Sequence, residues 1–483
     1  CSPTRAALIT GRNHHSAGFG VISEQSTGFP GYNSIIAKDK ATVGRILLDN
    51  GYCTAWFGKD HNTPAFAASQ VGPFDQWPTG MGFEYFYGFV GGDANHWAPN
   101  LFRNTTQIYP FEGKEPGTWN LLTAMADDAI DYISRMHQTD PSRPIFIKYA
   151  PGATHAPFHP TEQWVKKIRD MHLFDDGYNK LRETIFANQK RLGLIPKDAK
   201  LAPWPVDHLK PWDQLTDQEK KLFIRQVETF AAYAAYNDHE IGRVIDAFEQ
   251  AGRLDNTLVI YINGDNGTSA EGGPLGTPNE VAFFNGVNKM PAEIQMKWYD
   301  VWGTEETYNH MSAGWSWAFD TPFDWFKQNA SRLGGINQNM VVSWPTRIKD
   351  KGALREQFIH VIDVVPTILE AAGISAPKYV DGIKQKPIEG TSFAYTFDAA
   401  NAKAPSQHKT QYFEMMGQYA LYHEGWLLST KVNRAPWEAF GKANPDPLNN
   451  QVFQLYDLTK DFSQANDIAA RHPDKVAEMR NMF

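Results

Sequence analysis

Cysteine, blocks of basic residues and long apolar runs are all scarce in this chain of 483 residues. Cys1 and Cys53 are the only cysteines, so the sequence predicts no disulfide framework. The net charge is −8 and no block of about five Lys or Arg occurs, which argues against a nucleic-acid partner. No apolar stretch approaches the roughly 18 residues of a membrane span. What remains is a globular protein, because 42% of its residues are hydrophobic.

The two ends of the chain also lack expected features. There is no initiator methionine, and no strand precedes Cys1. The last residues, HPDKVAEMRNMF, have a helical pattern that stops abruptly at Phe483. We therefore expect a fragment cut at both ends, long enough to hold two domains.

The first 12 residues, CSPTRAALITGR, carry the most informative pattern. Pro3 suits the first turn of a helix, and Gly11 suits its C-terminal cap. Cys1 would then lie at a helix N-terminus, where free N–H groups and the helix dipole favour anions. Arg5, four residues on, falls on the same helix face. The pattern thus combines a nucleophile, an anion site and a fixed cation within one turn.

Strands and helices alternate along the rest of the chain. The expected helices cover residues 41–50, 121–136, 217–250 and 360–374, the last with a kink at Pro366. The expected strands cover residues 53–57, 144–150, 257–262 and 339–344. Near-continuous apolar strands between helices indicate an α/β protein whose sheet is covered on both faces.

Polar clusters follow three of these strands directly. Lys59 and His61 follow the first strand, His155 follows the second, and Asp265 and Asn266 follow the third. In open α/β sheets, ligands bind at the edge formed by the carboxyl ends of the strands. The order of strands and clusters therefore predicts a binding site at that edge.

Several segments resemble the type I sulfatases, which depend on formylglycine. CSPTRAALITGR resembles the first signature of that family, and GYCTAWFGKDH resembles the second. INGDNG resembles the strand end that carries metal ligands, and GGINQNMVVSWPTRIKDKG resembles the last sheet segment. The likeness covers nearly the whole chain and is closest to the long bacterial arylsulfatases. It implies an alkaline-phosphatase-like fold, a large mixed sheet sandwiched by helices with a smaller C-terminal antiparallel sheet plus helix.

The resemblance also implies a division of the chain into two domains. Residues 1–384 would form the catalytic domain, truncated at its N-terminus. Residues 385–483 would form a small α+β domain, because short strands expected at TQYFEMM, YALYHEG, WLLSTKV and VFQLYDL are followed by a helix.

Catalytic roles follow from the resemblance, residue by residue. Cys1 would be oxidised to formylglycine, whose hydrate attacks the sulfur of a sulfate monoester. Arg5 would hold that hydrate, and His61 would orient it and help to eliminate sulfate. His155 would protonate the leaving alcohol. The residues expected to bind the sulfate oxygens are Lys59 and Lys327.

The expected cofactor is a divalent metal, calcium or alternatively magnesium, with Asp265 and Asn266 as oxygen ligands. The family's other ligands, two adjacent Asp on a strand before the signature cysteine, have no counterpart here. We therefore expect this chain to bind calcium weakly. The expected partners are a small-molecule sulfate ester and the maturing enzyme that generates formylglycine.

A long Gly-rich and aromatic segment, residues 268–330, is a candidate substrate rim. It contains His310, Trp315 and Trp317, which we expect at the mouth of the site. Residues 157–221 are a second candidate for that position.

Three other functions stay open at the level of sequence. A phosphate or phosphonate monoester hydrolase of the same superfold would use similar cations and metal. An N-terminal-nucleophile amidohydrolase would use the amine of Cys1 as its base, but it gives no role to Arg5 or Lys59. A non-catalytic, sulfatase-like protein would bind a sulfated ligand without turnover.

Overall fold

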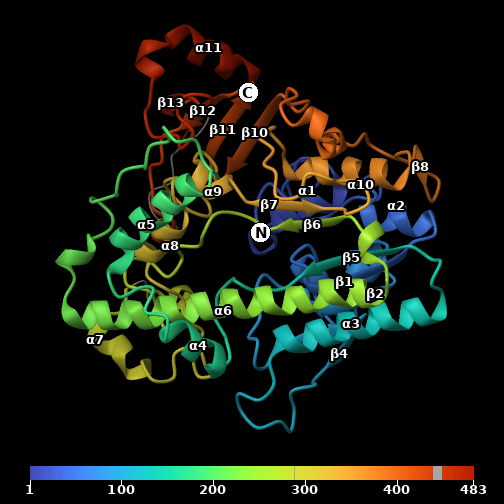
Figure 1. Cartoon of the computed structure of the whole chain (residues 1–483), viewed down its shortest axis with the longest axis horizontal. Helices are drawn as coiled ribbons and strands as arrows, with labels where there is room; N and C mark the ends of the chain where they lie inside the picture. The colour runs from blue at the N-terminus through green and yellow to red at the C-terminus, as the bar shows by residue number, and fades with distance from the viewer. Residues whose placement is uncertain (288, 439–445, 447–448) are drawn as a thin grey trace. The chain divides into compact units, whose positions relative to one another are not determined.

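The structure is a computed structural model that describes residues 1–287, 289–438, 446 and 449–483. Figure 1 traces its elements along the chain. The chain forms two compact units, each built from three segments. Unit 1 comprises Cys1–Ala153, Tyr236–Asp265 and Met340–His408, and unit 2 comprises Thr154–Ala235, Asn266–Asn339 and Lys409–Phe483.

The main sheet of unit 1 has five strands in the order β4-β3-β2-β1-β5. Strand β1 is parallel to β2 and β5, and β3 and β4 complete the sheet with antiparallel pairing. All seven residues of β1 are buried, as its apolar sequence predicts. The strands are β1 (Cys53–Lys59), β2 (Tyr85–Phe89), β3 (Leu101–Arg103), β4 (Thr106–Ile108) and β5 (Ile145–Ala150).

Helices cover both faces of this sheet. Alternate strand residues such as Phe57 and Phe89 pack with α3 (Leu121–Thr139) in one core cluster. Trp56 and Phe86 point to the other face and pack with Ala6 and Ile9, which lie in the N-terminal helix α1 (Ser2–Thr10). The expectation of a sheet covered on both faces is therefore confirmed.

Glycines allow the strands to pair closely beside the expected site. Gly58 has φ +96°, and a Cβ atom there would lie 2.2 Å from the carbonyl oxygen of Ala150 on β5. A Cβ atom on Gly88 of β2 would lie 1.9 Å from the carbonyl oxygen of Gly58. No side chain fits at either position, so the backbone just before Lys59 is fixed between its two neighbours.

Two further strands of unit 1, β6 (Val259–Ile262) and β7 (Met340–Ser343), pair antiparallel. Their apolar residues pack with α10 (Val364–Ala372) and the segment around Phe393. The predicted kink at Pro366 is wrong. A 3-10 turn at Val361–Asp363 precedes α10, so Pro366 lies in its first turn, where the missing N–H breaks no hydrogen bond.

Short elements complete unit 1. Helix α2 (Val43–Asp49) begins at the capping hydroxyl of Thr42, which accepts a hydrogen bond from the backbone N–H of Arg45. A small hairpin pairs β8 (Tyr379–Val380) with β9 (Ile383–Lys384).

Helix α6 (Asp217–Gln250) has the predicted bounds and contributes to both units. Among the described residues, none of the helices combines the length and apolar character needed to cross a membrane.

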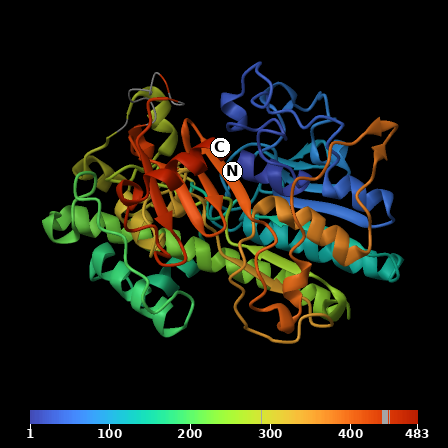
Figure 2. The same ribbon diagram turned by 90° about the horizontal axis from the view of Figure 1, so that it is seen from above.

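Unit 2 combines helices with a four-stranded antiparallel sheet of order β10-β11-β12-β13, drawn side by side in orange-red to red in Figure 2. Met479 of the last helix packs on Leu421, Leu428 and Leu455 of the sheet. The expected C-terminal sheet with its helix is confirmed, whereas the domain boundary at residue 384 stays a prediction. The strands are β10 (Thr410–Met415), β11 (Gln418–His423), β12 (Trp426–Thr430) and β13 (Phe453–Asp457); the helices are α4 (Glu162–Arg169), α5 (Gly177–Arg191), α7 (Ala292–Gln295), α8 (Ala313–Phe319), α9 (Leu333–Ile336) and α11 (Pro473–Met482).

Candidate active site

Helix α1 (Ser2–Thr10) presents Cys1 at its N-cap, as the sequence predicts. The backbone N–H of Arg5 donates to the carbonyl of Cys1 at 2.9 Å, which closes the first turn. Gly11 ends the helix with φ +66°, and a Cβ atom there would lie 3.0 Å from Val365. Cys1 is partly exposed and forms no disulfide. The nucleophile candidate therefore lies at the end of a helix whose start and stop are both fixed.

Arg5 connects three motifs of unit 1 that are far apart in the sequence. Its Nε donates to Oδ2 of Asp265 at 2.9 Å, and its Nη1 donates to the carbonyl of Lys59 at 2.8 Å. The hydroxyl of Thr4 donates to the carbonyl of Asp265 at 2.9 Å. The side chain of Arg5 is 10% exposed. The helix with Cys1 is thereby attached to the last residue of β1 and to the segment that follows β6, so two of the three predicted clusters meet.

The ionised form of Asp265 is strongly favoured. Burial alone would raise the pKa of this carboxyl, but the charges of Arg5 and Lys59 hold it well below its usual range. Among the described residues, only its Oδ2 accepts a side-chain hydrogen bond, from Arg5. Oδ2 of Asp265 is thus bonded to Arg5, and Oδ1 is suited to bind a cation.

His61 is buried in a loop attached to α1. The side-chain amide of Asn62 donates to the carbonyl of Ser2 at 3.0 Å, which joins this loop to the helix that starts beside Cys1. Burial lowers the pKa of His61 to about 3, so the ring is neutral. Its Nε2 lies 3.0 Å from both carboxylate oxygens of Glu24 and therefore carries the proton. Its buried Nδ1 has no hydrogen-bond partner among the described residues, so it can accept a hydrogen bond.

A second cluster of charged groups lies within unit 2. Nζ of Lys327 lies 2.7 Å from Oε2 of Glu271 and 3.3 Å from Nε2 of His155. The other ring nitrogen of His155, Nδ1, lies 2.6 Å from the carbonyl of Ala156. A carbonyl only accepts and an ammonium only donates, so Nδ1 of His155 carries a proton and Nε2 accepts from Lys327. Two residues predicted from different motifs are thus direct neighbours.

Glu271 is the one member of this cluster that sequence reasoning missed. It follows Asn266 by five residues in the Gly-rich stretch NGTSAEGG, where no strand or helix pattern singles it out. Its carboxylate also accepts from the side-chain amide of Gln328 at 2.8 Å. A lone acidic residue between glycines gives no signal of its own, and only the fold reveals its partners.

Asn266, the other expected metal ligand, begins unit 2 directly after Asp265. Its side-chain nitrogen donates to the carbonyl of Gly267 at 2.9 Å. Because the amide nitrogen is engaged there, Oδ1 is the end of this amide that can act as a ligand.

The expected substrate rim is wrong for its three named residues. Trp315 is fully buried and its indole N–H donates to the carbonyl of Phe223 at 2.9 Å within unit 2. Trp317 is 2% exposed and packs in a core cluster with Phe326. His310 is also fully buried, with Nε2 2.8 Å from the hydroxyl of Ser269. The aromatic residues of α8 are therefore part of the core of unit 2 and do not line a site mouth.

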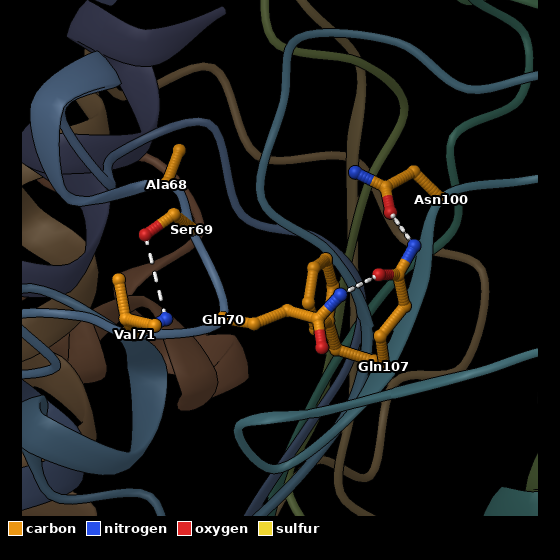
Figure 3. Close-up of a pocket in the computed structure, with 7 residues that line it drawn as sticks. Ala68, Ser69, Gln70, Val71, Asn100 and Gln107 are labelled. Carbon is orange, nitrogen blue, oxygen red and sulfur yellow. Dashed lines mark hydrogen bonds between the residues drawn. The ribbon is translucent and has the colours of Figure 1, made fainter.

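None of these residues lines the surface pocket of unit 1 that Figure 3 shows. Gln70 donates to Gln107, which in turn donates to Asn100 at 2.6 Å. Its lining contains no titratable side chain, so it does not suit acid–base chemistry. The lining residues are Ala68, Ser69, Gln70, Val71, Asn100, Phe102 and Gln107.

Comparison with known proteins places the chain in a family. The family model described as Sulfatase matches residues 1–374. An uncharacterized sulfatase of Schizosaccharomyces pombe is 28% identical over 511 residues, covering 99% of this chain and 83% of that protein. An arylsulfatase of Klebsiella aerogenes is 24% identical over 422 residues, covering 86% of this chain and 84% of that protein.

Solved structures support the fold. Ps i-CgsB, in complex with k-i-k-neocarrahexaose, matches with a TM-score of 0.61 and 18% identity over 100% of this chain and 81% of that chain. BT4656, in complex with its substrate D-glucosamine-2-N,6-O-disulfate, matches with a TM-score of 0.57 and 17% identity over 100% of this chain and 87% of that chain. The predicted alkaline-phosphatase-like α/β fold is confirmed. The chain therefore belongs to the sulfatase family and is an enzyme that hydrolyses sulfate esters.

Proposed function

We propose that this sulfatase cleaves sulfate monoesters with formylglycine made from Cys1 by a maturing enzyme. The observation that carries the proposal is the pair of hydrogen bonds from Arg5 to Asp265 and to the carbonyl of Lys59. They hold the helix that begins at Cys1 against a carboxylate and beside a lysine that is 1% exposed. A nucleophile in that place is presented to a site prepared for an anion.

The proposed metal is a divalent cation, calcium or magnesium, held in part by Asp265 and Asn266. The residues fit such an ion because the Asp265 carboxylate is ionised, has one oxygen outside its bond to Arg5, and is followed directly by an amide oxygen. When bound, such an ion supplies positive charge that draws electrons from the sulfate ester.

The residues of this chain then have distinct tasks in our proposal. Lys59 and Lys327 bind sulfate oxygens, which neutralises charge that grows in the transition state. The formylglycine hydrate would supply the nucleophile: one hydroxyl loses its proton to water as its oxygen bonds to sulfur, and the bond from sulfur to the alcohol oxygen breaks. His155, once Nε2 has taken up a second proton, gives that proton to the leaving oxygen. Arg5 orients the hydrate.

His61 acts in the second half of the proposed reaction. Its neutral ring has an acceptor at Nδ1, which accepts a hydrogen bond from the remaining hydroxyl and orients it while its proton passes to water. The aldehyde then reforms, the bond between its carbon and the sulfate oxygen breaks, and sulfate leaves. Water adds to the aldehyde and restores the hydrate.

Aryl sulfates and sulfated sugars are the substrates we propose, since the Klebsiella relative is an arylsulfatase and BT4656 binds a sulfated glucosamine. The test combines mass spectrometry with assays of 4-nitrophenyl sulfate on the intact protein, produced with and without a formylglycine-generating enzyme. Active enzyme should carry Cys1 about 18 Da lighter than cysteine, and Cys1→Ala should be inactive. Full activity with an unmodified thiol would refute the proposal.

A further inference from the structure

Glu271 contacts Lys327, a charged group that our proposed function uses. Its Oε2 lies 2.7 Å from Nζ of Lys327, and its Oε1 accepts from Gln328 at 2.8 Å. The side chain of Glu271 is 24% exposed and that of Lys327 is 12% exposed. This ion pair is largely shielded from water, so its geometry is better defined than that of a surface pair.

Ser269 and the buried His310 also help to fix the carboxylate of Glu271 within unit 2. The hydroxyl of Ser269 lies 3.1 Å from Oε2 of Glu271 and 2.8 Å from Nε2 of the buried His310. A Cβ atom on Gly272 would lie 2.7 Å from the ring of His310, so the turn after Glu271 packs tightly on that ring. Glu271 is therefore held by groups that do not depend on a bound substrate.

Charge explains why this carboxylate stays ionised. Burial would raise the pKa of Glu271, but Lys327 and then His155 hold it well below its usual range. An ionised Glu271 attracts the ammonium group of Lys327 and limits the positions that a long, flexible lysine side chain can adopt.

The second contact of Lys327 is His155, the proposed acid. Nζ of Lys327 lies 3.3 Å from Nε2 of His155, and that nitrogen accepts because Nδ1 faces the carbonyl of Ala156. A shift of the ammonium group would thus disturb the orientation of the imidazole ring as well as the sulfate contact of the lysine.

We propose that Glu271 is a positioning residue of this sulfatase, which anchors Lys327 and through it aligns His155. The inference rests on the proposed function, because it assumes that Lys327 and His155 act on the sulfate ester. Glu271 itself touches neither substrate nor the reacting atoms in this scheme.

The test is a double-mutant cycle in the intact, formylglycine-bearing enzyme. Glu271→Gln should lower kcat/KM for 4-nitrophenyl sulfate about 10- to 100-fold, the scale expected when a catalytic group is misplaced. In a Lys327→Ala background, the same substitution should change kcat/KM less than about twofold, because the group it positions is already gone. Glu271→Asp should recover part of the loss.

Glu228→Gln is the matched control, since it removes a largely buried carboxylate of the same unit that pairs with Arg169. It should leave kcat/KM unchanged, and thermal unfolding should confirm that each variant is folded. Equal losses for Glu271→Gln with and without Lys327, in folded protein, would overturn the inference and indicate a general structural role. So would an unchanged kcat/KM in Glu271→Gln.

A readout without turnover separates this inference from the proposed function. Nitrogen-15 NMR of labelled histidines should show His155 protonated on Nδ1 in the wild-type protein and a changed Nε2 signal in Glu271→Gln. If wild-type protein with formylglycine fails to hydrolyse sulfate monoesters, the proposed function fails, and the NMR comparison alone decides the Glu271 contact. An identical His155 signal in both proteins would refute it.

Discussion

Arg5 and Asp265 form an ion pair at 2.9 Å although 260 residues separate them in the sequence. The pair joins the helix of Cys1 to the segment after β6, and its arginine also donates to the carbonyl of Lys59, the last residue of β1. Removal of either partner leaves the other charge largely buried without compensation, which costs far more than the loss of a surface pair.

Arg5→Ala should therefore lower both stability and activity. We expect the free energy of unfolding to fall by about 3–5 kcal/mol, because Asp265 loses its counter-charge. Urea unfolding followed by circular dichroism measures this change. Arg45→Ala, which breaks the exposed pairs with Asp49 and Asp381, is the control and should cost less than about 1 kcal/mol. A similar cost for both variants would contradict the importance of the buried pair.

Asp265→Asn should reduce metal content. The amide has the size of the carboxylate but lacks its charge, so a divalent cation loses its main electrostatic attraction. Elemental analysis of the purified protein should show less bound calcium or magnesium than in wild type. Chelation should lower the activity of wild type, and calcium or magnesium should restore it. Asp255→Asn changes an exposed aspartate and should leave metal content unaltered; undiminished metal in Asp265→Asn would disprove the ligand assignment.

His61 should make stability depend on pH in a defined window. Burial lowers its pKa from 6.5 to about 3, so the unfolded chain binds a proton that the folded protein excludes. The contribution of neutral His61 is complete above pH 6.5 and is lost as the pH falls, at up to about 1.4 kcal/mol per pH unit.

Glu24 also makes the folded protein less stable as the pH falls, but at lower pH values than His61. Burial would raise its pKa, yet the hydrogen bond with His61 helps to lower it from 4.5 to about 2, so its stabilisation is lost below pH 4.5. Between pH 6.5 and pH 4.5, therefore, His61 and not Glu24 contributes to the change in stability. Urea unfolding at several pH values should show a shallower decline for His61→Gln there, and parallel curves for both proteins would refute the buried neutral ring.

His155 and the two lysines can be distinguished by the leaving group. His155→Ala should slow hydrolysis of alkyl sulfates by about 10² to 10⁴-fold, because a poorly acidic alcohol needs a proton in order to leave. The loss with 4-nitrophenyl sulfate should be much smaller, since nitrophenolate leaves without help. Lys59→Ala should lose activity equally on both substrates, because it acts on the shared sulfate. Lys327→Ala should lose activity on both and more on alkyl sulfates, because Lys327 also contacts His155. Equal losses for His155→Ala would mean that it binds the anion instead.

Trp315 should matter for folding more than for substrate binding. Trp315→Ala would leave a cavity in the core of unit 2 and should cost about 3–5 kcal/mol of unfolding free energy. Phe66→Ala, at a side chain that is 65% exposed, should stay within about 0.5 kcal/mol of wild type. A stable Trp315→Ala protein with a raised KM would restore the substrate rim that the sequence suggested.

Local sequence patterns were sufficient to predict the elements of unit 1 that carry candidate site residues. Pro3 and Gly11 define α1, and the apolar run before Lys59 defines β1, because each signal acts within a few residues. Composition alone could not tell a buried indole from an exposed one, so Trp317 was placed wrongly. Glu271 was missed because its partner Lys327 lies 56 residues away, beyond any periodicity.

The hydrogen bond from the backbone N–H of Glu389 to the carbonyl of Gly11 has a consequence for the timing of biosynthesis. Helix α1 cannot reach its final contacts until residue 389 has been synthesised. At about 5–20 residues per second, that takes roughly 20 to 75 seconds after Gly11 is made. Throughout that interval the CSPTR segment remains available to a modifying enzyme, whereas in the finished protein Ser2 and Pro3 are buried. The oxidation of Cys1 that we propose would therefore be easiest while the chain is still growing.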